Sequence, residues 1–206
     1  MLAKQKSWDL AIEAYRRGLK QVNAAELAAR LHTTLGLADK TAERDKFAAT
    51  WLKDNPKDVV FQLHLADGAL SRQDHAGAEK IYLAALQVQP DNAVALNNLA
   101  WVSGKLRRDA AITYAEKAVA LVPSQPAYVD TLAMLVSDKN DYARAVELQT
   151  KALSMQPNNS LFRLNLAKIH IKGGKKDLAR KELDQLAKLG DRFAGQSEVA
   201  DLLKGL

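Results

Sequence analysis

Cysteine is absent from this chain of 206 residues. Disulfide bonds, thiolate metal sites and cysteine nucleophiles are therefore excluded together, and the absence fits the cytoplasm and the periplasm equally. No apolar run approaches the roughly 18 residues that a membrane helix needs. The segment from Met1 to Lys20 lacks the uninterrupted apolar core of a signal peptide and has the spacing of an amphipathic helix. The composition, 48% hydrophobic and 26% charged, is that of an ordinary globular protein.

Proline is also scarce, and its placement reveals a repeat. Four of the five prolines recur at nearly equal intervals: Pro56, Pro90, Pro123 and Pro157. A fixed period of this length indicates equivalent units that stack, each burying its apolar face against its neighbours. Such a stack presents a surface and seldom forms a catalytic pocket.

The apolar residues inside each unit follow helical spacing. Ala78, Ile81, Tyr82 and Ala85 recur at three and four residues, which places them on one face of a helix. The unit from 93 to 125 fits the same register after losing one residue between 104 and 109. Small residues occupy the middle of the first helix of each unit, where a methyl group lets two helix axes approach closely: Ala66, Ala100, Ala133 and Ala167. The sequence therefore predicts a pair of antiparallel helices, A and B, in each unit.

This pattern resembles the tetratricopeptide repeat. Ala78, Tyr82, Ala85 and Pro90 carry the second half of the family's repeat intact. Other units depart from it, and Gln149 stands where Tyr82 does. The resemblance implies an all-α fold, a right-handed α-solenoid of antiparallel helix pairs with about 11 to 12 helices, in which helix A lines the concave side.

We predict a single solenoid over residues 1–206. Residues 1–24 form a partial repeat with helix B only, and 25–58 form a degenerate repeat. Four repeats follow at 59–92, 93–125, 126–159 and 160–193, and 194–206 form a C-terminal capping helix with Val199, Leu202 and Leu203 facing inward. Because the first segment has no helix A before it, we expect the chain to be a fragment of a longer array.

The resemblance also assigns residues of helix A to a concave groove that binds a protein or peptide. The assigned residues are Val60, Leu63, Asp67, Leu70, Val94, Asn97, Trp101, Asp130, Met134, Leu164, Lys168 and Ile171. Trp101 is expected to project away from the buried side and to anchor the partner; the alternative is that it fills space beside the shortened turn. The family's clamp for a C-terminal carboxylate wants basic residues where Leu63, Asp130 and Leu164 stand, so a chaperone-tail receptor is disfavoured.

Basic residues gather near the C-terminus. Between positions 160 and 192 there are nine Lys or Arg and four Asp or Glu. Five of them form a basic patch: Lys172, Lys175, Lys176, Arg180 and Lys181. The patch is either an ordinary solvated helix face or a docking surface for a polyanion or polysaccharide. No aromatic residues alternate with these lysines, so nucleic acid is not an expected partner.

Neither catalysis nor a metal or other cofactor is expected. The four histidines, His32, His64, His75 and His170, have no second histidine at three or four residues, and the single acids at that spacing, Asp67 after His64 and Glu79 after His75, do not make a convincing metal pair. His170 is expected in the core or the groove. Gly173 and Gly174 form a turn between helices, since the pattern of a phosphate-binding loop is absent.

A narrower resemblance concerns the setting. The runs from Asn97 to Trp101, from Asp130 to Ala133 and from Ala179 to Leu183, with the pair Leu202 and Leu203, look like the C-terminal repeats of tetratricopeptide lipoproteins of bacterial exosortase systems. This resemblance implies a periplasmic scaffold in exopolysaccharide export or protein sorting. It also implies that the parent is held at the membrane by a lipid anchor outside this fragment.

Overall fold

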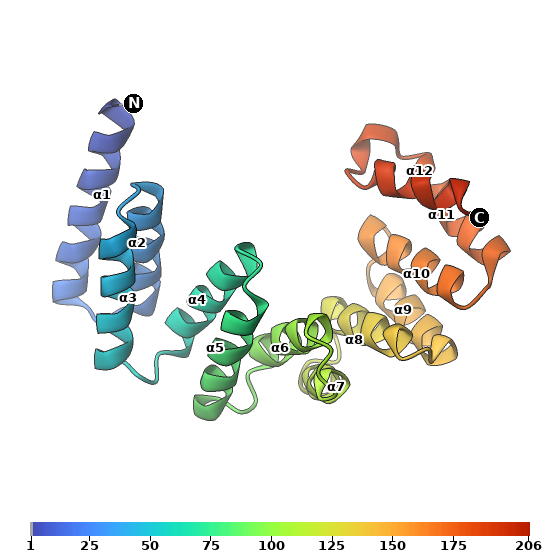
Figure 1. The fold of residues 1–206 in the computed structure, drawn as a ribbon, viewed down its shortest axis with the longest axis horizontal. Helices are drawn as coiled ribbons and strands as arrows, with labels where there is room; N and C mark the ends of the chain where they lie inside the picture. Colours follow the sequence, from blue (N-terminus) through green and yellow to red (C-terminus); the bar gives the residue numbers. More distant parts are fainter. Residues whose placement is uncertain (1) are drawn as a thin grey trace. The chain divides into compact units, whose positions relative to one another are not determined.

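The computed structural model describes residues 2–206, with side chains from Gln5 onward. The expectation that the chain is a fragment beginning at Met1 concerns a residue outside this range. The described residues form twelve α-helices and one short 3-10 turn, and no strand occurs among them (Figure 1). The helices are α1 (Leu2–Gln21), α2 (Ala25–Leu37), α3 (Thr41–Asp54), α4 (Val59–Ser71), α5 (His75–Val88), α6 (Ala93–Lys105), α7 (Ala111–Leu121), α8 (Pro126–Asp138), α9 (Tyr142–Met155), α10 (Ser160–Lys172), α11 (Lys176–Ala187) and α12 (Gln196–Lys204). The predicted all-α fold is confirmed. None of the described helices is long and apolar enough to cross a membrane.

Backbone contacts divide the chain into two compact units, which we call unit 1 (Met1–Pro90) and unit 2 (Asp91–Leu206). The boundary falls at the proline that closes the repeat predicted at 59–92. The continuous solenoid over both units stays a prediction. Within each unit, consecutive helices pack as pairs.

The first helix of unit 1 has a packing partner. The apolar face of α1 contributes Ile12 to a buried cluster with Leu31 and Leu35 of α2, and Trp8 and Tyr15 pack against it. Helix α2 therefore packs on the face of α1 that carries Ile12. A second cluster joins Ala28, Trp51 and Phe61 from α2, α3 and α4.

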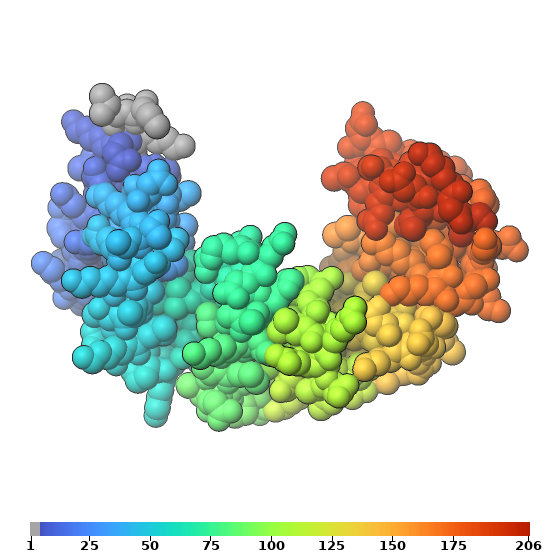
Figure 2. Space-filling model, viewed as in Figure 1, coloured from blue at the N-terminus to red at the C-terminus, as the bar shows by residue number. Residues whose placement is uncertain are grey.

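Unit 2 is built from the pairs α6 with α7, α8 with α9 and α10 with α11. The A helices α6, α8 and α10 also contact one another in sequence order. Their central small residues, Ala100, Ala133 and Ala167, are fully buried, as close helix packing requires. The last helix, α12, buries Val199 beside the partly buried Leu202 and Leu203, so the predicted inward face is observed. The space-filling view shows no break between these C-terminal helices (Figure 2).

Every turn between helix A and helix B contains one residue in the left-handed conformation. These residues recur with the same period as the prolines: Asp39, Gln73, Arg107, Asn140 and Gly174. Only Gly174, with φ of 71°, adopts this conformation without a steric penalty from a β-carbon. The four non-glycine residues accept that cost in order to end helix A and start helix B at a fixed point of the repeat.

The same turns locate the shortened repeat. Ala145 follows the left-handed Asn140 by five residues, whereas the corresponding Ala111 follows Arg107 by four. The missing residue therefore lies after Arg107 and before Ala111, at the C-terminal end of the predicted interval. Helix α7 accordingly begins without a side-chain cap, at Ala111.

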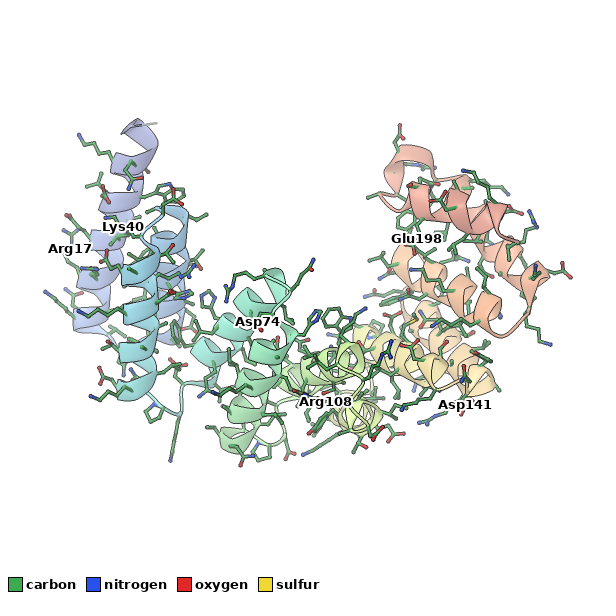
Figure 3. The ribbon with its side chains drawn as sticks, in the orientation of Figure 1. Arg17, Lys40, Asp74, Arg108, Asp141 and Glu198 are labelled. Carbon is green, nitrogen blue, oxygen red and sulfur yellow. The ribbon has the colours of Figure 1, made fainter. Side chains whose placement is uncertain are left out.

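Asp and Asn side chains cap the starts of several helices. Asp74 accepts a hydrogen bond from the Gly77 amide at the start of α5, and Asp141 accepts one from Arg144 at the start of α9 (Figure 3). Other caps are Asp58, Asn92 and Asn159. Each cap satisfies an amide that the helix leaves unbonded, and replacement of such a cap by alanine costs about 1 kcal/mol.

Candidate functional site

Three successive A helices of unit 2 form a cavity of about 300 Å³. Its lining comes only from α6, α8 and α10. The lining residues are Trp101, Gly104 and Lys105 from α6; Asp130, Thr131, Met134, Leu135 and Asp138 from α8; and Asn165 and Lys168 from α10. Trp101, Asp130, Met134 and Lys168 were assigned to the groove from sequence, and the structure brings these four side chains together.

Trp101 forms one wall of the cavity. It lies between residues that are fully buried, Leu99 and Val102, yet Trp101 itself is 41% exposed. The projection expected from the sequence is therefore observed. The ammonium group of Lys105, one turn further along α6, lies 5.2 Å from the centre of the indole ring. At this distance the face of the ring attracts a cation.

Asp130 lines the cavity and is only partly accessible to solvent. Its Oδ1 accepts a hydrogen bond from Gln149 Nε2 at 2.6 Å and another from Asn165 Nδ2 at 2.9 Å. Loss of solvent raises the pKa of the Asp130 carboxyl, while these hydrogen bonds and the charge of Lys168 act in the opposite direction. Two amides thus fix one oxygen of a partly desolvated carboxylate.

The donor Gln149 is itself an exception to the repeat pattern. It occupies the helix B position where Tyr82 stands in unit 1, and its side chain is 0% exposed. Besides Asp130, its amide nitrogen donates to the carbonyl oxygen of Phe162 at 2.9 Å. Because glutamine is shorter and more polar than tyrosine, Gln149 makes less apolar contact at this core position and instead forms hydrogen bonds to the A helices α8 and α10.

Two cations beside the cavity are held by ion pairs. Lys168 Nζ lies 2.7 Å from an oxygen of Glu198 on α12, which is labelled in Figure 3. Lys172 Nζ lies 2.6 Å from Asp138. The C-terminal helix therefore takes part in setting the charge around the cavity.

The remaining residues assigned to the groove lie outside this cavity. Leu164 is 2% exposed and packs in the core with Ala167 and Leu183, so it offers no surface to a partner. In unit 2, Ile171 is partly buried, Val94 is exposed, and Asn97 donates a hydrogen bond to Asn98. In unit 1, Val60 and Asp67 are exposed and Leu63 and Leu70 are partly buried.

The basic patch is exposed but partly paired. Lys175, Arg180 and Lys181 are exposed and form no ion pair among the described residues. Lys172 is held by Asp138, and Lys176 Nζ donates to the carbonyl oxygen of Leu206. The patch therefore has fewer unpaired basic side chains than its five residues in the sequence indicate.

Unit 1 contains a polar pair that helical spacing did not reveal. His32 Nδ1 and His64 Nε2 lie 3.0 Å apart, from the A helices α2 and α4, at the edge of an open cavity of about 400 Å³. Burial, followed by the nearby His64 and Arg44, lowers the pKa of His32 to about 4. His32 and His64 are separated by nearly one repeat length, which is the feature of the sequence that could have predicted their proximity. No cluster of three metal-ligating side chains occurs among the described residues.

Comparison with known proteins supports the repeat assignment. Residues 138–204 match the family model described as tetratricopeptide repeat. No curated protein matches the chain. Three solved structures illustrate the fold it shares, at identities that establish the fold alone.

The first is YrrB, described as a tetratricopeptide-repeat protein with an unusual peptide-binding site, at 15% identity and a TM-score of 0.71 over 95% of this chain and 100% of that one. The second is PilW, a type IV pilus biogenesis factor, at 18% identity and a TM-score of 0.73 over 87% and 86%. The third is a thermophilic protein of Thermus thermophilus, at 16% identity and a TM-score of 0.67 over 87% and 99%. The chain therefore has the fold of tetratricopeptide-repeat proteins, and its residues 138–204 match the repeat of that family.

Proposed function

We propose that the protein is a non-catalytic scaffold that binds a segment of a partner protein in the cavity formed by α6, α8 and α10. The observation that carries this proposal is the convergence of Trp101, Asp130 and Met134 from two helices onto one open cavity. An exposed indole beside a flexible thioether gives an apolar anchor point, and the polar side chains of the lining give orientation. The fold is shared with YrrB, whose description names a peptide-binding site, and this likeness supports the proposal.

The groove lacks the set of basic residues with which a carboxylate clamp holds a free C-terminus. Asp130 stands at a position where a carboxylate clamp needs a cation, and Lys168 is already paired with Glu198. A partner segment is therefore bound through internal residues, as an extended chain or a helix.

The test is selection of peptides from a random display library on the whole chain, followed by measurement of Kd. We expect selected peptides to bind Trp101→Ala at least about tenfold more weakly than the wild type, because anchoring aromatic residues contribute about 2 kcal/mol or more. Leu121→Ala is the matched control, since Leu121 is 40% exposed but lies on the B helix α7. Equal binding to wild type and Trp101→Ala, with both variants folded, overturns the proposal.

For the biological setting, we propose an envelope role in an exosortase-type export system, on the periplasmic side and in a lipid-anchored parent. The support is the resemblance in the runs ending at Trp101, Ala133 and Leu183. Fractionation of cells that express the full parent, with and without globomycin treatment to block lipoprotein processing, tests this proposal. Recovery of the parent in the cytosol under both conditions would refute it.

The alternative function, binding of a polyanion or polysaccharide, rests on the exposed Lys175, Arg180 and Lys181. It predicts binding to dextran sulfate that weakens steeply between low and high salt, because exposed charges are screened within about 8 Å at physiological ionic strength. Loss of this binding in the triple variant Lys175→Gln, Arg180→Gln and Lys181→Gln would favour it over the groove proposal. Binding that does not depend on salt would count against it.

A further inference from the structure

A fully buried glutamine is a costly choice for a repeat core. At the equivalent position in unit 1, Tyr82 fills the space with an aromatic ring. Gln149 fills less of it and must bury an amide, whose Oε1 has no hydrogen-bond partner among the described residues. Burying a polar group without full compensation is unfavourable, so such a residue in a core calls for a reason other than packing. The hydrogen bonds of Gln149 supply one, because its Nε2 donates to Asp130.

We propose that Asp130 receives the cationic side chain of a Lys or Arg residue in the partner segment, with Gln149 and Asn165 holding the carboxylate in place. This inference rests on the proposed function and names the chemistry of the same site. Both amides donate to Oδ1, which fixes the orientation of the carboxylate before a partner arrives. A preoriented acceptor loses little conformational freedom on binding.

The lining contains two cations, Lys105 and Lys168, and two carboxylates, so the preference for a cationic guest comes from the surroundings of Asp130 and not from the net charge of the cavity. The cavity contains two acidic side chains, and one of them, Asp138, forms an ion pair with Lys172. Lys168 is paired with Glu198 on α12. Asp130 is the acidic side chain of this cavity that has no ion pair among the described residues, so its charge is available to an incoming cation.

The apolar part of the lining suits the same guest. The face of Trp101 already lies 5.2 Å from the ammonium group of Lys105. The aliphatic stem of a Lys or Arg can lie along Met134 and the indole while its charged end reaches the carboxylate. An acidic or purely apolar side chain would leave the desolvated Asp130 uncompensated. Its pKa, raised by desolvation, is consistent with a carboxylate whose counter-charge comes from outside.

The decisive experiment selects peptides from a random display library separately on the wild type and on Asp130→Asn. Asparagine keeps the size and an oxygen that can accept from Gln149 and Asn165, so this variant should fold. We expect Lys or Arg to be enriched at one fixed position on the wild type, and this preference to be absent on Asp130→Asn. The best wild-type peptide should bind Asp130→Asn at least about tenfold more weakly, the loss expected for one hydrogen-bonded charge pair.

Substitution in the peptide gives an independent measurement on the unaltered protein. Replacing the enriched Lys or Arg by methionine should weaken binding to the wild type by a similar factor and leave binding to Asp130→Asn unchanged. Gln149→Met tests the positioning role, because it should weaken the peptide that carries the cation but not its methionine version. A merely structural role for Gln149 would weaken both peptides equally.

Each outcome decides between the two proposals. Selection of no peptide on the wild type overturns both. Peptides that bind through Trp101 but show no basic preference, or that bind Asp130→Asn equally well, overturn the assignment of Asp130 and leave the proposed function standing. Loss of the basic preference on Asp130→Asn together with retained unfolding stability supports the assignment.

Discussion

Tyr82 in unit 1 and Gln149 in unit 2 occupy the same helix B position of the repeat, but their side chains contribute differently to the structure. Both side chains are 0% exposed, and both donate a hydrogen bond to an Asp on the preceding helix A. Tyr82 OH lies 2.8 Å from Asp67, and Gln149 Nε2 lies 2.6 Å from Asp130. The tyrosine adds a large apolar ring to the core, whereas the glutamine adds mainly hydrogen bonds. Both residues therefore hold a carboxylate of helix A, but Tyr82 also fills the core with its ring, and we propose that Gln149 serves mainly to place Asp130.

Tyr82→Ala should have the largest effect on stability and tests the first half of this comparison. Removing a fully buried aromatic ring leaves a cavity, and such changes cost about 3 to 5 kcal/mol in the free energy of unfolding. Urea denaturation followed by circular dichroism measures the change. The neighbouring Leu83→Ala is the control, since Leu83 is 40% exposed and its loss should cost under about 1 kcal/mol. Equal costs at the two positions would contradict the role assigned to Tyr82.

Acid should weaken unit 1 through its histidine pair. The folded pKa of His32 is about 4, below its ordinary value of 6.5, and burial also lowers the pKa of His64. The unfolded chain therefore binds protons first as pH falls from 6.5 towards 4. Since solvent screens these half-buried rings, the folded state loses on the order of 1 to 2 kcal/mol over this window. Urea denaturation at pH 7.5 and 4.5 measures the loss.

A matched variant isolates the pair from other titrating groups. His32→Gln should reduce the acid-induced loss, because it removes one of the two rings whose pKa burial lowers. Asp130 shifts in the opposite sense: its raised folded pKa means that protonation in acid relieves a cost in unit 2. Hydrogen exchange should therefore show α2 and α4 opening more readily in acid than α8. Uniform acid weakening of both units would contradict this difference.

Gln149→Met should change the free energy of unfolding by less than about 1 kcal/mol, because an apolar chain of similar size replaces a buried amide whose hydrogen bonds have a small net value. Thermal unfolding, compared with Tyr82→Ala, measures it. A loss above about 2 kcal/mol would mean that Gln149, like Tyr82, is chiefly a stability residue.

Trp101→Ala should have the smallest effect on folding, below about 0.5 kcal/mol beyond its helix propensity, because Trp101 is 41% exposed. The same variant is expected to lose peptide binding. This dissociation between stability and binding is what separates an anchor from a packing residue. A large loss of stability would favour the alternative that Trp101 fills space beside the shortened turn.

The sequence predicted the helices well because each repeat carries local signals for where its helices begin and how closely they pack. Asp74 and Asp141 mark helix starts by a capping chemistry that acts locally, and the alanines of each pair mark close packing. The left-handed turn residues were missed, since Asp39, Gln73 and Arg107 share a backbone conformation but no side-chain type.

The candidate site was predictable only in part. The register of helix A assigned Trp101 and Asp130 to one face, and the structure places both on the same cavity. Asn165 and Gln149 were missed as partners of Asp130, because their hydrogen bonds join residues that are far apart in the sequence. Leu164 was assigned to the groove by register alone, but the packing of α10 places it in the core. Such details depend on packing between helices rather than on spacing within one.

Hydrogen exchange on the complex with a selected peptide tests the central claim most directly. The account predicts that the bound peptide slows amide exchange in α6, α8 and α10, the three helices that line the cavity, and leaves α7 and α9 unchanged. Protection confined to the B helices, or to unit 1, would contradict the account, because the partner would then bind somewhere other than the cavity of Trp101 and Asp130.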